Sequence, residues 1–182
     1  MITSCIIFLA SFSSAEVNTP IFNETQYIQE YISCTRFVPK SMHKHADLYY
    51  EFFEEENIAT AVRIGWCESR GKENAYRDDN GDSGLMQFVS WTWNWIAEEH
   101  DLPMWDEWVI LKDGRPYTEN KVSKTDIGFE QIQVQFSTYY NIYFASILAQ
   151  DMYGRTQWRD WNSSKFCWGN PKKFQNKWTN EN

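Results

Sequence analysis

Residues 57–71 read NIATAVRIGWCESRG, a clear helical pattern. The apolar positions recur at three- and four-residue spacing, which is typical of a helix with one face in a core; they are Ile58, Ala61, Val62, Gly65 and Trp66. Asn57 is suited to cap the start of this helix, and Gly71 to end it. We therefore expect a core helix from Ile58 to about Ser69, with Glu68 near its C-terminal end.

The same helical period continues on both sides of this stretch. It predicts further helices at about residues 41–56, 90–100 and 130–152. Between the second and third of these four helices lie a polar loop at 72–83 and the short apolar string GLMQF at 84–88. The chain is therefore expected to be mainly helical.

Residues 101–128 interrupt the helical pattern. Asp113 and Gly114, followed by Arg115 and Pro116, form a turn signal with short apolar runs before it. We expect this segment to be an insertion that forms a small β-hairpin. The expected fold class is accordingly mainly α (α+β), with the hairpin as its β part.

Composition restricts the kind of partner. The chain has 182 residues, 42% of them hydrophobic and 18% aromatic, which suits one domain with a large core. Aromatic rings in such excess fill a core or stack on the apolar faces of sugars. The net charge of −8 makes nucleic acid a poor partner. It also repels other anionic polymers, although salt screens that repulsion over about 8–10 Å.

The N-terminus resembles an export signal. Residues 1–15 contain a short apolar run followed by small residues, with Ser13 and Ala15 placed as in a signal-peptidase site. The run is shorter than the ~20 residues that span a bilayer, so no stable membrane anchor is expected. We expect a signal peptide at 1–15, an irregular arm at 16–40 and the main domain at 41–182. The protein would then be secreted, periplasmic or carried in a virion.

Four cysteines bear on redox state and metal binding. If Cys5 leaves with the signal peptide, Cys34, Cys67 and Cys167 remain, which leaves one disulfide and one spare thiol. In an oxidising compartment we expect Cys67 to pair with Cys167. The sequence contains no C-x-x-C and no His-rich ligand spacing, so neither a metal nor a cofactor is predicted.

Glu68 is the candidate catalytic residue. It follows an apolar helix, where partial desolvation and the negative end of the helix dipole would both raise its carboxyl pKa. A protonated carboxyl group is the state that a general acid needs to protonate a glycosidic oxygen. The position alone is weak support, because a Glu at a helix end is more often a solvated surface group.

Three motifs in order strengthen that interpretation. Cys67-Glu68-Ser69, then Ser83-Gly84-Leu85-Met86-Gln87-Phe88, then Thr92-Trp93 resemble the lysozyme-like superfamily. The resemblance is closest to lytic transglycosylases and to the transglycosylase-like domains of phage and bacterial wall-remodelling proteins. Those families carry an E-S motif on the catalytic helix, followed after about twenty residues by G-L-M-Q; here Gln87 comes nineteen residues after Glu68. The chain ending, with Tyr153-Gly154, Trp158, Trp161 and Cys167-Trp168, also resembles theirs, so the likeness covers about residues 55–100 and 130–168.

The resemblance implies a lysozyme-like domain and a role for each matched residue. Glu68 would be the general acid and then the base, and Ser69 would help to orient it. Gly84 would let the backbone approach the sugar. Met86 and Gln87 would line the cleft.

Two further expectations separate the possible reactions. Tyr143 and Tyr153 are candidates for the cleft tyrosine of transglycosylases, although the usual A-Y-N motif is replaced here by Asn141-Ile142-Tyr143. Asp82 is the candidate second carboxylate, which a lysozyme-type hydrolase would need.

The resemblance implies peptidoglycan glycan strands as the substrate. The sequence does not determine the oligomeric state, for which we expect a monomer. A lytic transglycosylase uses one Glu to cut the MurNAc–GlcNAc β-1,4 bond and leaves a 1,6-anhydro ring. The alternatives are a hydrolase assisted by Asp82 and a non-catalytic glycan-binding or virion structural protein of the same fold.

Overall fold

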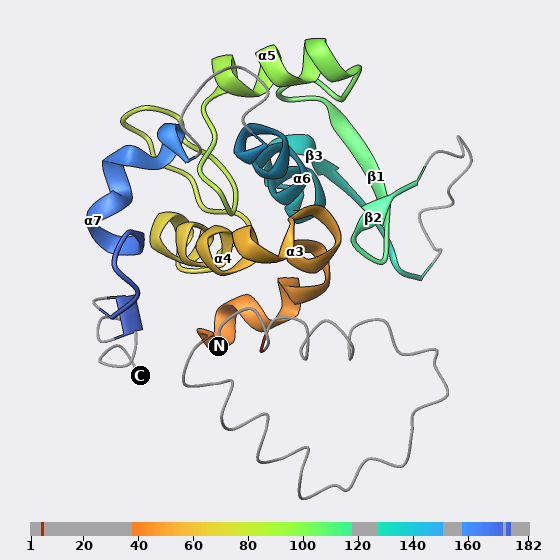
Figure 1. Cartoon of the computed structure of the whole chain (residues 1–182). Helices are drawn as coiled ribbons and strands as arrows, with labels where there is room; N and C mark the ends of the chain where they lie inside the picture. Colours follow the sequence, from red (N-terminus) through yellow and green to blue (C-terminus); the bar gives the residue numbers. More distant parts are fainter. Residues whose placement is uncertain (1–4, 6–37, 118–126, 151–157, 173, 176–182) are drawn as a thin grey trace, which may run out of the picture. The chain divides into compact units, whose positions relative to one another are not determined.

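The computed structural model describes residues 5, 38–117, 127–150, 158–172 and 174–175 (Figure 1). The chain divides into two compact units. The helical unit comprises Met1–Gly71 and Trp158–Asn182, and the sheet unit comprises Lys72–Gln157. The predicted single domain at 41–182 therefore contains parts of both units. The predicted arm at 16–40 and most of the predicted signal peptide lie outside the described residues.

The described part of the helical unit is built from short helices around one longer helix. In chain order these are η1 (Lys40–His45), α3 (Ala46–Phe52), α4 (Glu55–Ser69), η3 (Arg159–Ser164) and α7 (Lys165–Trp168). The predicted helix at 41–56 is divided, because the backbone becomes extended at Phe53 (φ −111°, ψ 141°). The acidic run belongs to the start of α4, with Glu55 and Glu56 in its first turn. Negative charge there is favoured by the partial positive charge of a helix N-terminus.

The predicted core helix is confirmed as α4, which begins three residues earlier than expected. Its end is formed by Arg70, which adopts the left-handed conformation (φ 59°) and donates its backbone N–H to Trp66 O at 2.8 Å. The Arg70 guanidinium also lies 4.0 Å from the centre of the Trp66 ring, a favourable cation–π distance. Gly71 follows with φ +75°. These two residues end the helix together, where the sequence indicated Gly71 alone.

Covalent and polar links hold α4 against the C-terminal segment of the helical unit. Cys67 and Cys167 form the expected disulfide, with Cα atoms 6.0 Å apart. Arg63 donates from Nε to the backbone oxygen of Trp168 at 3.0 Å. Cys5, which was expected to leave with the signal peptide, is instead buried and disulfide-bonded, and no described cysteine is a free thiol. Cys34, for which the sequence left both a free and a paired state open, lies outside the described residues.

The sheet unit joins two helices to a small sheet. Its elements are α5 (Ser90–His100), β1 (Trp108–Lys112), β2 (Arg115–Pro116), β3 (Phe129–Gln133), η2 (Val134–Phe136) and α6 (Thr138–Ala149). The three strands are antiparallel in the order β2-β1-β3 (Figure 1). The predicted hairpin is present as β1 and β2, with Asp113 (φ 51°) and Gly114 (φ 77°) at the turn. Two positive φ angles are what the tight hairpin turn requires.

The helix predicted from Glu130 begins eight residues later. Residues 129–133 instead form β3, which pairs along its whole length with β1, from Phe129 opposite Lys112 to Gln133 opposite Trp108. The helix starts only after Ser137, whose hydroxyl accepts from the Tyr140 N–H at 3.5 Å. Pairing with β1 therefore determines the structure of residues 129–133 more strongly than their local helical pattern does.

Aromatic residues pack together inside the sheet unit. The Trp93 ring of α5 stacks on Phe144 of α6, with 4.0 Å between ring centres, and Phe88 meets Trp93 edge-on at 5.5 Å. The Trp93 indole N–H also donates to Pro103 O at 3.0 Å. Core packing therefore accounts for part of the aromatic excess, and Trp93 of the third sequence motif is a core residue.

The described residues give the coarse fold class. They are mostly helical with one three-stranded antiparallel sheet, which agrees with the mainly α (α+β) expectation. No helix among them is long and apolar enough to cross a bilayer.

Candidate functional site

Glu68 occupies the last turn of α4. The residue is half-buried, and its carboxyl oxygen Oε1 is buried. The preceding residue carries the disulfide to Cys167, so the backbone that bears Glu68 is covalently fixed to the C-terminal segment. The structure thus presents one carboxyl group that is partly shielded from water and held on a rigid support.

Ser69 supports the end of this helix. Its hydroxyl donates to Gly65 O at 2.9 Å and accepts from the Gly71 N–H at 3.1 Å. A serine hydroxyl has only one proton to donate, and here it goes to the backbone. Ser69, which was expected to help orient Glu68, thus donates its proton to the backbone and fixes the end of the helix that carries Glu68.

The GLMQF string of the sheet unit forms a tight turn. Ser83 and Phe88 exchange both backbone hydrogen bonds, at 2.9 and 3.0 Å. Gly84 has φ +78°, and a Cβ there would lie 2.3 Å from Gln135 O and 2.4 Å from Asn141 Nδ2. Glycine is thus required by contacts with the protein itself. The close approach predicted toward a sugar is made toward α6 and η2 instead.

Asn141 anchors that turn from α6. The side chain is fully buried, and its Oδ1 accepts from the Met86 N–H at 3.1 Å. Its Nδ2 donates to Gln135 O at 2.7 Å and to Ser137 O at 3.2 Å. The sequence interpretation missed this role, although an asparagine in the otherwise apolar stretch of α6 was a usable signal.

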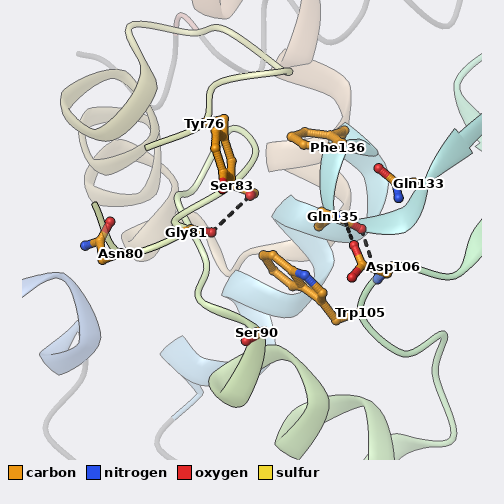
Figure 2. Close-up of a pocket in the computed structure, with 10 residues that line it drawn as sticks. All are labelled: Tyr76, Asn80, Gly81, Ser83, Ser90, Trp105, Asp106, Gln133, Gln135 and Phe136. Atoms are coloured by element: carbon orange, nitrogen blue, oxygen red, sulfur yellow. Dashed lines mark hydrogen bonds between the residues drawn. The ribbon is translucent and has the colours of Figure 1, made fainter. Parts of the chain in front are cut away.

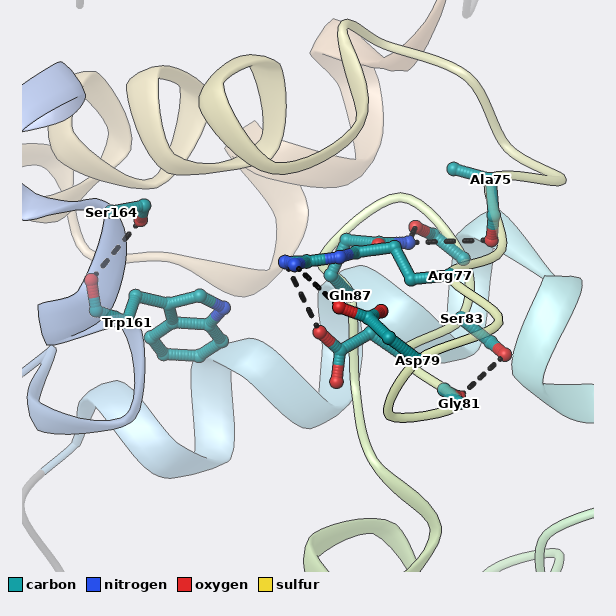
Figure 3. A network of polar contacts seen from close by, with 10 residues as sticks. Ala75, Arg77, Asp79, Gly81, Ser83, Gln87, Trp161 and Ser164 are labelled. Atoms are coloured by element: carbon teal, nitrogen blue, oxygen red, sulfur yellow. Dashed lines mark hydrogen bonds and ion pairs between the residues drawn. The ribbon is translucent and has the colours of Figure 1, made fainter.

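Met86 and Gln87 face the interior of the turn. Met86 is fully buried, so the expectation that it lines a cleft is wrong. Gln87 adopts a left-handed backbone (φ 54°), and its Nε2 donates to Gly84 O at 2.9 Å and to Ala75 O at 3.3 Å (Figure 3). These bonds occupy the side-chain amide nitrogen of Gln87 and give a structural role to a residue that was expected to line the cleft.

Asp82 closes the polar loop that precedes the turn. Its side chain is 12% exposed and lies 3.6 Å from Arg77 Nη1. Arg77 Nη2 lies 3.4 Å from Asp79 Oδ2, and Figure 3 shows these two side chains together. Arg77 also donates its backbone N–H to Asp82 O at 3.0 Å. This arrangement matches a turn-forming aspartate.

Only one of the two candidate tyrosines lies among the residues that the structure describes. Tyr143 lies half-buried on α6, with its ring centre 6.3 Å from that of Tyr139. Tyr153 lies outside the described residues.

The sheet unit contains a pocket that the sequence interpretation did not find. Its volume is about 320 Å³, and Figure 2 shows its lining. The lining combines three aromatic rings, those of Tyr76, Trp105 and Phe136, with polar side chains that include Ser83, Asp106 and Gln135. They come from the 72–89 loop, from the α5–β1 connection and from η2. No pattern local to one segment could have identified them.

The described residues contain no cluster of three or more His, Cys, Asp or Glu side chains that could hold a metal ion. No protein-family model, curated protein or solved structure matches this chain. The functional assignment therefore depends on the residues themselves.

Proposed function

We propose that this protein is a lytic transglycosylase of lysozyme-like fold, which cuts peptidoglycan glycan strands with Glu68 as its single acid and base. The observation that carries the proposal is the burial of Glu68 Oε1 at the end of a helix fixed by the Cys67–Cys167 disulfide. Burial disfavours the charged form of a carboxyl group, and a general acid must keep its proton until the leaving oxygen takes it. Three motifs that follow one another in the order seen in the lysozyme-like superfamily supply the substrate class.

The chemistry needs one carboxyl group. Glu68 protonates the glycosidic oxygen as the bond from C1 of the muramic residue breaks, and the N-acetyl oxygen stabilises the positive charge that develops at C1. The carboxylate then takes the proton of the C6 hydroxyl, whose oxygen bonds to C1 and closes the 1,6-anhydro ring. Glu68 regains its proton, and no water is consumed. Action on a cell wall would also require export, which the predicted signal at residues 1–15 would provide.

Replacement of Glu68 by Gln tests this assignment. The amide keeps the size of the side chain but carries no transferable acid proton, so release of muropeptides from purified sacculi should fall by about 100-fold or more. Glu56→Gln is the matched control, since Glu56 lies exposed on the same helix. The control should release muropeptides at the wild-type rate. Undiminished release by Glu68→Gln would reject Glu68 as the catalytic acid.

Mass spectrometry of the products separates the transglycosylase from its nearest alternative. A transglycosylase leaves 1,6-anhydromuramic ends, whereas a hydrolase assisted by Asp82 leaves reducing ends. The contacts of Asp82 with Arg77 favour a structural role for it, so we expect anhydro ends. Reducing ends that disappear in Asp82→Asn would establish the hydrolase instead. A non-catalytic glycan-binding protein would bind sacculi and release neither product.

A further inference from the structure

The η3 segment contains a tripeptide of the kind that accepts a glycan. Asn162-Ser163-Ser164 has the form Asn-x-Ser, with a residue other than proline in the middle. This is the acceptor motif for asparagine-linked glycosylation of exported proteins. A second such motif, Asn23-Glu24-Thr25, lies outside the described residues. Because a short motif also arises by chance, the surroundings of Asn162 decide whether it can serve.

The structure turns the Asn162 side chain outward. Its neighbour Trp161 is buried, and the backbone oxygen of Trp161 accepts from Trp168 Nε1 at 3.0 Å and from Ser164 Oγ at 3.1 Å (Figure 3). Asn162 and Ser163 are exposed. Among the described contacts, Asn162 uses only its backbone oxygen, which accepts from the Lys165 N–H. A glycan on Asn162 Nδ2 would therefore break no described hydrogen bond and disturb no core residue.

The disulfides indicate a suitable compartment. Cys67 is bonded to Cys167, and Cys5 is disulfide-bonded as well. Disulfides form and persist in oxidising compartments such as the endoplasmic reticulum and the bacterial periplasm. Oligosaccharyltransferases act in the same compartments. The bonded cysteines and the Asn-x-Ser motif therefore fit one export route.

We propose that Asn162 is a site of asparagine-linked glycosylation. The donor is an oligosaccharide joined through pyrophosphate to a polyprenyl lipid. Asn162 Nδ2 bonds to C1 of the first sugar as the bond from C1 to the pyrophosphate oxygen breaks. Polyprenyl pyrophosphate leaves, and the proton that the amide gives up passes to solvent. The inference goes beyond the proposed function and does not depend on it, because it requires export and an accessible asparagine but no catalytic residue.

Peptide mass spectrometry of exported protein tests the assignment. Trypsin cuts after Arg159 and Lys165, so it releases residues 160–165 with Asn162 as their one asparagine. The full-length chain is exported from a eukaryotic cell line and, in a second arm, from bacteria that carry an oligosaccharyltransferase. The wild-type peptide should carry a glycan in at least one arm, and Asn162→Gln should lose it. An unmodified wild-type peptide in both arms would overturn the proposal.

Two neighbouring serines provide matched variants. Ser164→Ala removes the hydroxyl group that the motif requires and should abolish the modification, whereas Ser164→Thr keeps a hydroxyl group and should retain it. Ser163→Ala makes the same change one residue earlier, where the motif accepts any residue except proline, so glycosylation should be unchanged. A glycan that persists in Ser164→Ala, or one that is lost in Ser163→Ala, would also reject the site.

Asp160 distinguishes the two export routes. It is exposed and precedes Asn162 by two residues. Bacterial oligosaccharyltransferases require an acidic residue at that position, whereas those of the endoplasmic reticulum do not. Asp160→Ala should therefore lose the glycan in the bacterial arm and keep any glycan that the wild type carries in the eukaryotic arm. Loss from the eukaryotic arm would contradict assignment of the modification to the Asn-x-Ser motif.

Discussion

Asn141 and Gly84 show how single residues build the turn at 83–88. The buried amide of Asn141 satisfies the Met86 N–H and two carbonyl groups, at Gln135 and Ser137. Buried polar backbone groups that lose a partner carry the full penalty of desolvation. The absence of a side chain at Gly84 is what lets this amide come so close. The two residues therefore form one structural unit.

Gly84→Ala should destabilise the protein severely. Its Cβ would meet Gln135 O and the Asn141 amide, and the backbone would carry a positive φ as well, so we expect a loss on the order of 3 kcal/mol or more in the free energy of unfolding. Urea denaturation measures the loss.

Gly81→Ala separates the two causes. Gly81 has φ +75°, but a Cβ there meets nothing within 4 Å. Only backbone strain remains, which should lower the unfolding free energy by about 1 kcal/mol. Equal losses in Gly81→Ala and Gly84→Ala would mean that the contacts with Asn141 and Gln135 do not restrict position 84.

At the scale of elements, local signals predicted α4 and α5 well. Both helices carry periodic apolar residues, and Gly71, which suits a left-handed backbone, follows the end of α4. The sequence did not reveal β3, because residues 129–133 become a strand only through pairing with β1, about twenty residues away. The pocket was missed for the same reason. Trp105 and Asp106 line the pocket only because the α5–β1 connection meets η2 through Gln135.

The link between α4 and α7 should matter for both stability and catalysis. The Cys67–Cys167 disulfide joins residues separated by 100 positions, and closing a long loop restricts the unfolded chain. The double variant Cys67→Ala/Cys167→Ala should lose about 2–4 kcal/mol of unfolding free energy. Muropeptide release should also fall at temperatures where the variant is still folded, because Glu68 adjoins the bridge.

Arg63→Met is a useful companion to the disulfide variant. It removes the hydrogen bond to Trp168 O but keeps the covalent link between the helices. Muropeptide release should fall less in this variant than in the double cysteine variant. Thermal unfolding should likewise show a smaller loss of stability. Full activity in the folded cysteine variant would show that the bridge does not position Glu68.

At the scale of the whole molecule, charge should govern how the protein meets a cell wall. The chain carries a net charge of −8, and walls that bear anionic polymers repel it. The Debye length falls from about 30 Å at 0.01 M salt to about 8 Å at 0.15 M, so added salt shortens the range of this repulsion. The rate of muropeptide release from such walls should therefore rise several-fold across that interval. Sacculi stripped of their anionic polymers provide the control, and their digestion should change little. A rate that falls with salt on intact walls would mean that a local positive surface, and not the net charge, determines the encounter.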